Sequence, residues 1–190
     1  MTVWTMPPEW QLHTATWMGF PTSAYDTAGV SDDDVFDAWA QVANTISEHE
    51  PVHMLCHPGQ LTIAQKKLAS AVTLHAFEID DAWIRDSGPT FVTGEHGLGG
   101  VDWVFNGWGD HTAFDWSQDA KVASHVIELT GAKRLGSELV NEGGGIHVNG
   151  EGDVLLTRTV QLDPGRNPTA TEDTVCLLYT SDAADDVVGV

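Results

Sequence analysis

The feature that most constrains the fold of this chain is a pattern that occurs twice. Each copy has a helix, a strand, a polar loop with acidic residues and a hairpin with a glycine-rich turn. In the first copy Asp86 precedes the turn at residues 97–100, and in the second Glu142 and His147 precede the turn at residues 150–152. Units of this kind predict an α/β architecture around a ligand-lined axis, with both polar loops facing one shared centre.

Apolar spacing and turn residues predict where the individual elements lie. We expect strands at residues 14–20, 52–56, 72–79 and 133–140. Helices are expected at residues 60–71 and 116–129, the latter closed by Gly131, and in a segment that starts with the acids at 32–34 and ends before Pro51. That first helix shows apolar residues at helical spacing, namely Val35, Trp39, Val42 and Ile46.

The charge balance limits the partners of the chain. Its 190 residues include 8 Lys and Arg against 28 Asp and Glu, a formal net charge of −20. Such a surface repels phosphate backbones, so we expect no nucleic-acid partner. It could attract a cationic ligand, although a solvated acidic face is the commoner explanation.

The sequence also predicts a cytoplasmic location. No apolar run approaches the roughly 18 residues of a membrane span, and the first ten residues do not resemble a secretory signal. Cys56 and Cys176 are the two cysteines, and their wide separation makes a poor disulfide framework. We therefore expect no membrane partner and a reducing compartment.

Two polar clusters are candidates for chemistry. In DDAWIRDSGP, Asp86 and Trp83 could hold a planar cation, the acid by pairing with it and the ring by stacking on it. The alternative is that Arg85 pairs with a neighbouring acid while Trp83 packs in the core.

The second cluster lies in NEGGGIHVN. Three glycines allow close backbone approach and aim Glu142 differently from His147, while strand alternation places His147 and Asn149 on one face. An acid and an imidazole that converge are a workable acid/base and cation-binding pair. A structural histidine in a strand is the competing interpretation.

A third cluster, HEPVHMLCH, is a weaker candidate for a metal site. A helix would align His49, His53 and His57, but Pro51 argues against a helix there. Cys56 makes a poor nucleophile because it lies in an apolar strand without an evident base. No phosphate-binding glycine loop is present. We therefore expect neither a metal nor a cofactor.

Six motifs together resemble one known family. MPPEW, ATWMGFP, DDAWIRDSGPTF, FNGWG, NEGGGIHVNGEG and LDPGRNP occur in order over residues 6–168, similar to the agmatine deiminase and Porphyromonas-type peptidyl-arginine deiminase family. The resemblance implies the pentein fold, a propeller of five pseudo-symmetric αβ units around a central active site. It also implies chains about twice as long. We therefore expect residues 1–174 to be the N-terminal part of the catalytic domain, a partial propeller of two to three units.

The family's reaction, as the resemblance implies it, is hydrolysis of a guanidinium group by a cysteine thiolate. Agmatine would yield N-carbamoylputrescine and ammonia, a step of putrescine biosynthesis. Asp86 falls on the family's guanidinium-binding aspartate, Glu142 on its active-site glutamate and His147 on its acid/base histidine. Trp83 falls on an aromatic residue at the mouth of the pocket, so Trp83, Asp86, Glu142 and Asn149 are the predicted substrate-binding residues.

Two departures from the family pattern carry consequences. Asn149 stands where we expect the family to have an aspartate, which would weaken guanidinium binding or thiol activation. The glycine-rich motif of the nucleophile is absent, and residues 175–190 look like a non-native tail from a frameshift or an assembly artefact, with an ordinary irregular C-terminus as the alternative. The nucleophile role is therefore not given to Cys176, and we expect this chain alone to be inactive.

Three other functions remain open at this point. The same chemistry could act on peptidyl-arginine or free arginine instead of agmatine. The net charge and the missing nucleophile would also suit a non-catalytic module that binds polyamines or other cations. A metal-dependent hydrolase would rest on the histidines of residues 49–57 alone.

Overall fold

The computed structural model describes residues 4–23, 29–110 and 115–175. These residues divide into two compact units. Unit 1 comprises residues 4–11, 85–110, 115 and 120–175, and unit 2 comprises residues 12–23, 29–84 and 116–119. Across the described ranges, no helix is both long and apolar enough to cross a bilayer.

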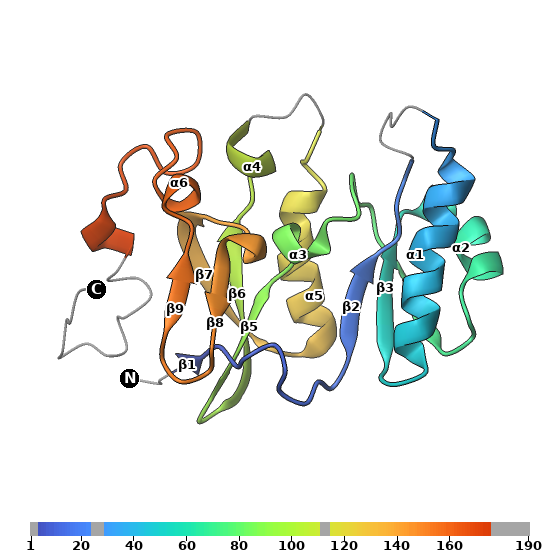
Figure 1. Cartoon of the computed structure of the whole chain (residues 1–190), viewed down its shortest axis with the longest axis horizontal. Helices are drawn as coiled ribbons and strands as arrows, with labels where there is room; N and C mark the ends of the chain where they lie inside the picture. The colour runs from blue at the N-terminus through green and yellow to red at the C-terminus, as the bar shows by residue number, and fades with distance from the viewer. Residues whose placement is uncertain (1–3, 24–28, 111–114, 176–190) are drawn as a thin grey trace. The chain divides into compact units, whose positions relative to one another are not determined.

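Unit 2 is a three-stranded parallel sheet with two helices. The strands β2 (Thr16–Gly19), β3 (Val52–Cys56) and β4 (Val72–Ala76) are hydrogen-bonded in the order β2-β3-β4. Helices α1 (Asp32–Ser47) and α2 (Leu61–Lys67), with the short η1 (Pro58–Gln60), provide the crossovers that parallel pairing requires (Figure 1). The buried core between helices and sheet is formed by Phe20, Phe36, Ala43, Val52, Met54, Cys56, Ala64 and Val72.

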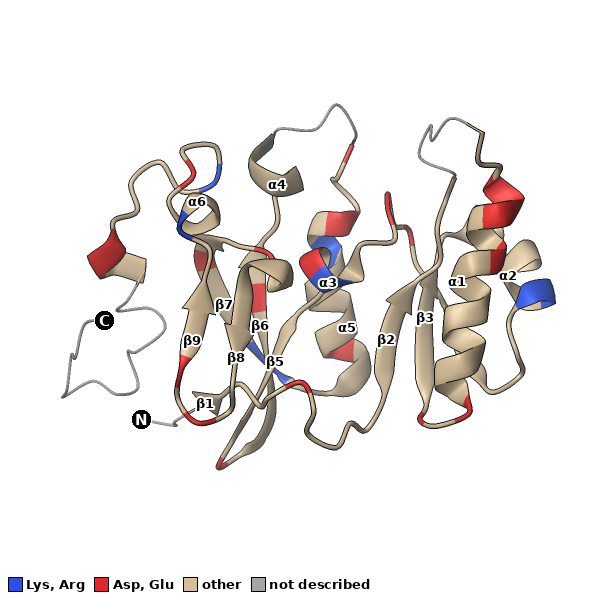
Figure 2. Cartoon of the chain, in the orientation of Figure 1, with Lys and Arg blue, Asp and Glu red and all other residues tan. Residues whose placement is uncertain are grey.

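Helix α1 begins at Asp32, the first residue of the acidic run, as predicted. Ser31 is the N-cap, and its hydroxyl accepts a hydrogen bond from the Asp34 backbone N–H at 3.2 Å. The Asp34 carboxylate in turn accepts the Ser31 N–H at 3.1 Å, which completes a capping box. The acids at 32–34 thus form the first turn, visible in red at the start of α1 in Figure 2, where they complement the helix dipole.

Unit 1 contains a four-stranded sheet in the order β1-β5-β6-β7. The strands are β1 (Trp4–Thr5), β5 (Thr90–Gly94), β6 (Gly97–Val104) and β7 (Lys133–Val140). Strands β5 and β6 form the predicted hairpin, while β6 and β7 are parallel and joined through η2 (Asp119–Lys121) and α5 (Val122–Thr130). Gly131 ends α5 in the left-handed conformation with φ 66°, as predicted.

Helix α5 starts later than the expected residue 116. The backbone N–H groups of Gln118 and Asp119 donate instead to the Asp80 carboxylate, at 2.7 and 3.2 Å. The Asp119 carboxyl group in turn accepts hydrogen bonds from the backbone N–H groups of Asp80 and Asp81, at 2.9 and 3.3 Å. These hydrogen bonds satisfy the backbone donors of Gln118 and Asp119 from outside the segment, and α5 begins after them.

The second hairpin of unit 1 follows the glycine run. Residues 143–145 form η3 (Gly143–Gly145), which leads into β8 (Ile146–Val148) and β9 (Val154–Leu156), and then α6 (Arg158–Gln161). Ile146 and Val148 pack with Trp103 in a buried cluster. Two single-turn helices complete the unit: α3 (Ile84–Ser87) and α4 (Gly107–Asp110). The α/β fold class predicted from the sequence is confirmed.

The buried Asp119 makes the stability of the chain dependent on pH. Burial is the main cause that raises the pKa of this carboxyl from 3.8 to about 7. Between pH 3.8 and about 7 the folded state therefore holds a proton that the unfolded state has released. The resulting contribution to the free energy of unfolding is fully present below pH 3.8 and is lost as pH rises through 7. The free energy of unfolding should therefore fall by about 1–3 kcal/mol between pH 5 and 8. Asp119→Asn keeps the acceptor oxygen but cannot titrate, so we expect it to lack this fall. Urea titrations of both proteins at the two pH values measure this difference; equal slopes with pH would contradict it.

Candidate functional site

Asp86 lies in α3 of unit 1, and both of its carboxylate oxygens are held by neutral donors. The backbone N–H of Gly144 donates to Oδ1 at 3.0 Å, and the indole N–H of Trp108 donates to Oδ2 at 3.1 Å. Arg85 pairs with Glu9, not with Asp86. Within the described residues, no Lys or Arg forms an ion pair with Asp86. Its negative charge is therefore oriented but not compensated.

Glu142 is a buried carboxylate at the N-cap of η3, with 3% of the residue exposed. The guanidinium of Arg166 donates from Nε to Oε1 at 2.8 Å. Burial raises the pKa of Glu142, and the hydrogen bond and charge of Arg166 oppose that rise. The negative charges of Asp86 and Asp163 add to the rise in the pKa of Glu142.

The glycine run is what lets these two acids approach. A Cβ on Gly143 would lie 2.3 Å from the Arg85 carbonyl oxygen, and one on Gly144 would lie 2.6 Å from Oδ1 of Asp86. Any side chain at either position would push η3 away from α3. The prediction that these glycines permit close backbone approach is confirmed, and the contact is between the two loops that carry Asp86 and Glu142.

Trp108 is a site residue that sequence reasoning missed. Its backbone lies in the left-handed region (φ 60°, ψ 41°) between Gly107 and Gly109, which also have positive φ. It is the one non-glycine residue with positive φ in the described part of the chain. Strained backbone of this kind gathers at functional sites. The available signal was a large aromatic residue flanked by glycines in the FNGWG motif.

His147 and Asn149 lie near Glu142 in sequence, but within the described residues neither forms a hydrogen bond or ion pair with Glu142 or Asp86. The side chain of His147 is on the exposed face of β8, whereas its neighbours Ile146 and Val148 are buried. Within the described residues, no hydrogen bond or ion pair joins His147 to Asp86 or Glu142. Its predicted catalytic role stays a prediction.

The amide of Asn149 closes the β8–β9 turn. Its Oδ1 accepts from the backbone N–H groups of Glu151 and Asp153 at 2.8 and 3.2 Å, and its Nδ2 donates to the Asp153 carboxylate at 2.8 Å. Both ends of the amide thus already have partners in its own loop. Its predicted part in substrate binding also stays a prediction.

Trp83 belongs to unit 2, where it is 46% exposed. Its ring meets Trp39 of α1 edge-on, with centroids 6.2 Å apart. This exposure does not fit the alternative in which Trp83 packs in the core. A half-exposed ring still has surface available for stacking on a planar cation, so its predicted role remains open to test.

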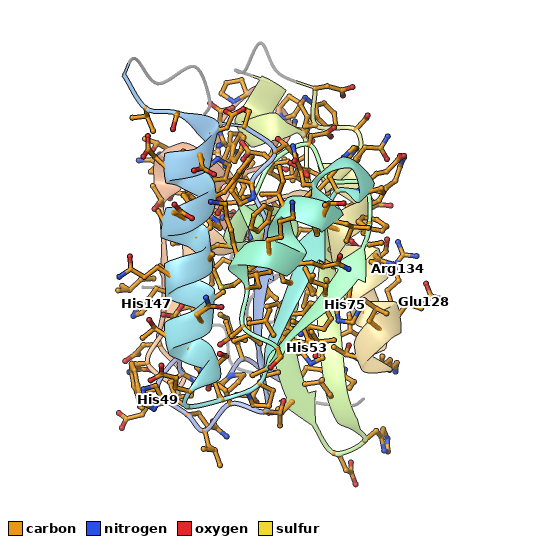
Figure 3. The ribbon with its side chains drawn as sticks, turned by 90° about the vertical axis from the view of Figure 1, so that its right-hand side faces the viewer. His49, His53, His75, Glu128, Arg134 and His147 are labelled. Carbon is orange, nitrogen blue, oxygen red and sulfur yellow. The ribbon has the colours of Figure 1, made fainter. Side chains whose placement is uncertain are left out.

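Of the histidines of the weaker cluster, His49 and His53 lie apart from each other (Figure 3). Nδ1 of His53 and Nε2 of His75 lie 2.8 Å apart, and both rings stack on Trp17. His57 instead accepts the Gly59 N–H at the start of η1, and His49 follows the end of α1. Within the described residues, no group of three or more His, Cys, Asp or Glu side chains is arranged to hold a metal ion.

Cys56 has the properties of a structural thiol. It is fully buried in the core of unit 2, and burial raises its pKa to about 11. At neutral pH it is therefore a thiol, which is a poor nucleophile. Of the suspected non-native tail at residues 175–190, Cys176 and everything after it lie outside the described residues.

Comparison with known proteins relates the chain to guanidine-modifying enzymes. A model of the Porphyromonas-type peptidyl-arginine deiminases matches residues 5–179. A Streptomyces coelicolor protein named "Putative agmatine deiminase" is 52% identical over 170 residues, covering 86% of this chain and 49% of that protein. A protein of the same name from Streptomyces avermitilis is 48% identical over 176 residues, covering 90% and 50%. This chain spans about half the length of the curated relatives it matches.

Solved structures agree. Agmatine deiminase of Enterococcus faecalis matches with a TM-score of 0.87 at 32% identity, covering 93% of this chain and 50% of that chain. A crystal structure of a protein named "putative peptidyl-arginine deiminase" matches with a TM-score of 0.83 at 24% identity, which bears on the fold alone. These matches confirm the predicted fold class, an α/β chain that forms part of a pentein propeller.

Proposed function

Because the chain belongs to the family of Porphyromonas-type peptidyl-arginine deiminases, we propose that it provides the guanidinium-binding carboxylates of an enzyme that hydrolyses agmatine. The products would be N-carbamoylputrescine and ammonia. The names of the relatives that are 52% and 48% identical support agmatine as the substrate. We propose that this reaction takes place in the cytoplasm, as a step of putrescine biosynthesis.

The observation that carries the proposal is the paired arrangement of Asp86 and Glu142. A guanidinium is planar, permanently charged and rich in N–H donors, so it is best held by carboxylates that can accept several hydrogen bonds. Asp86 offers a carboxylate that neutral donors orient, and Glu142 offers a second acceptor next to the glycines that contact the loop of Asp86. Trp83 would add a ring face for the cation.

The reaction also needs a thiolate, which the described residues do not supply. In the proposed sequence a thiolate sulfur attacks the guanidinium carbon, ammonia leaves with a proton from an acid, and water then displaces the sulfur to give the ureido product. His147 is proposed as the group that transfers those protons, on the basis of the family resemblance. Cys56 is unsuited to the attack because its pKa is about 11.

We expect the 190-residue chain by itself to release no ammonia from agmatine above the buffer rate. A hybrid in which this chain replaces the matching residues of the Streptomyces coelicolor relative should be active, because it combines the carboxylates with that protein's remaining residues. A coupled ammonia assay measures both proteins. Turnover by the chain alone would refute the expected inactivity, and a folded but inactive hybrid would refute the proposed function.

The same hybrid separates the alternatives. Equal or greater turnover of an arginyl peptide than of agmatine would favour peptidyl-arginine deimination, which the name of the matching family model supports. A chain that binds agmatine but never supports turnover in the hybrid would be a cation-binding module, for which the net charge of −20 is the supporting observation.

A further inference from the structure

Two loops of unit 1 each carry a residue whose side chain contacts one of the candidate carboxylates. The first loop, residues 105–109, carries Trp108, whose indole N–H reaches Asp86. The second, residues 162–167, carries Arg166, whose guanidinium reaches Glu142. Neither Trp108 nor Arg166 was a candidate on sequence grounds.

The side chain of Asn106 joins these two loops. Its Oδ1 accepts the Gly109 N–H at 2.8 Å, and its Nδ2 donates to the Gly165 carbonyl at 2.9 Å. The backbones are in direct contact, because a Cβ on Gly165 would lie 2.4 Å from the Gly109 carbonyl oxygen. The residues that contact Asp86 and Glu142 therefore lie on two loops that are hydrogen-bonded to each other.

The loop that carries Arg166 is also fixed from its other side. Oδ1 of Asp163 accepts the backbone N–H groups of Gly165 and Arg166 at 2.9 and 3.0 Å. The amide of Asn167 bonds to both the N–H and the carbonyl of Val140, at 3.0 and 2.8 Å, at the end of β7 just before Glu142. The Arg166 side chain, 10% exposed, is thus held in its contact with Glu142 from two directions.

The hydrogen-bond donors at the two acids differ in charge, being neutral at Asp86 and positively charged at Glu142. Asp86 gets hydrogen bonds from an indole and a peptide N–H, which orient a carboxylate without cancelling its charge. Glu142 gets a full positive charge within hydrogen-bonding distance, in a buried place where an unpaired carboxylate would be costly. An incoming cation should therefore be attracted more strongly by the charge of Asp86 than by that of Glu142, which Arg166 already pairs with.

We propose that Trp108 and Arg166 are positioning residues that divide the work of the two acids. Trp108 keeps the Asp86 carboxylate oriented for the substrate's guanidinium, whereas Arg166 holds the Glu142 carboxylate in place as a hydrogen-bond acceptor beside that guanidinium. The inference rests on the proposed function, since it assumes that a guanidinium binds between these acids. It predicts that the two residues fail in different ways when they are replaced.

Replacing Arg166 should change the pH dependence of Glu142. In the full 190-residue chain, Arg166→Gln should raise the midpoint of the Glu142 titration, because the hydrogen bond and the positive charge that lower the pKa of Glu142 are lost. The titration is read by carboxyl carbon NMR, with the signal assigned by its loss in Glu142→Gln. Arg158→Gln is the matched control, since Arg158 is exposed and pairs with Glu172. Its Glu142 midpoint should equal that of the unmodified chain.

Replacing Trp108 should weaken binding without moving that midpoint. Trp108→Phe keeps an aromatic ring but removes the N–H that Asp86 accepts, so calorimetry should show agmatine bound about three- to tenfold more weakly. Trp103→Phe is the control, because its indole N–H donates to Thr90 and not to Asp86. That control should bind agmatine as the unmodified chain does.

The outcomes separate this inference from the function on which it rests. No detectable agmatine binding by the unmodified chain would overturn both. Binding by the unmodified chain with an unshifted Glu142 midpoint in Arg166→Gln, or with equal losses in Trp108→Phe and Trp103→Phe, would overturn the positioning roles alone. If Arg166→Gln fails to fold, Arg166→Lys decides: it keeps the charge but not the Nε contact, and an unchanged midpoint together with unchanged agmatine affinity would reject a positioning role for the guanidinium.

Discussion

Asp86→Asn is expected to lower the affinity of the chain for agmatine at least about a hundredfold, which corresponds to about 2.7 kcal/mol. The substitution keeps one oxygen acceptor but removes the uncompensated charge that the site presents to a cation. In the hybrid with the Streptomyces relative, the same change should lower kcat/KM by at least the same factor. Isothermal calorimetry and the ammonia assay measure the two effects.

A control for this prediction must remove the same charge elsewhere. Asp33 lies on the exposed first turn of α1 and pairs with Lys67, so Asp33→Asn lowers the net negative charge equally without touching the site. We expect it to change agmatine affinity less than about twofold, because surface charges are screened by salt. Similar losses in both variants would mean that the whole acidic surface, and not Asp86, attracts the ligand.

Phe20→Ala should cost about 3–5 kcal/mol of unfolding free energy. Phe20 has no exposed surface, and its ring stacks on Phe36 with centroids 5.3 Å apart in the core of unit 2. The smaller side chain leaves a cavity that the surrounding strands and α1 cannot fully close. Urea unfolding followed by tryptophan fluorescence measures the loss. Trp10→Ala is the comparison, since Trp10 is 70% exposed, and an equally large loss there would contradict this account of the core.

Local patterns in the sequence predicted most elements of the fold. Alternation and apolar runs located β3 and β7, helical spacing located α1, and Gly131 located the end of α5. These features depend on neighbours within one or two turns of chain, which a sequence displays directly. The start of α5 was placed too early because Gln118, which precedes the helix, donates its backbone N–H to Asp80, a partner 38 residues away in the sequence.

The candidate site was predicted less completely for the same reason. Asp86 and Glu142 stood out because each is an acid in a glycine-containing loop after a strand. Their partners Trp108 and Arg166 are 22 and 24 residues distant from them, and nothing in a single sequence specifies such pairings. The turn contacts of Asn149 are local, but Asx turns of this kind look the same in sequence as a polar residue that faces a ligand.

The most direct test of the guanidinium site is a calorimetric comparison of agmatine with putrescine, its analogue with an amine in place of the guanidinium, on the unmodified chain. A site built on Asp86 and Glu142 predicts one-to-one binding of agmatine that is at least about tenfold tighter than that of putrescine, because only the planar group can use several carboxylate oxygens at once. Equal affinities for the two cations would contradict it, since they would show attraction to the negative surface without recognition of a guanidinium.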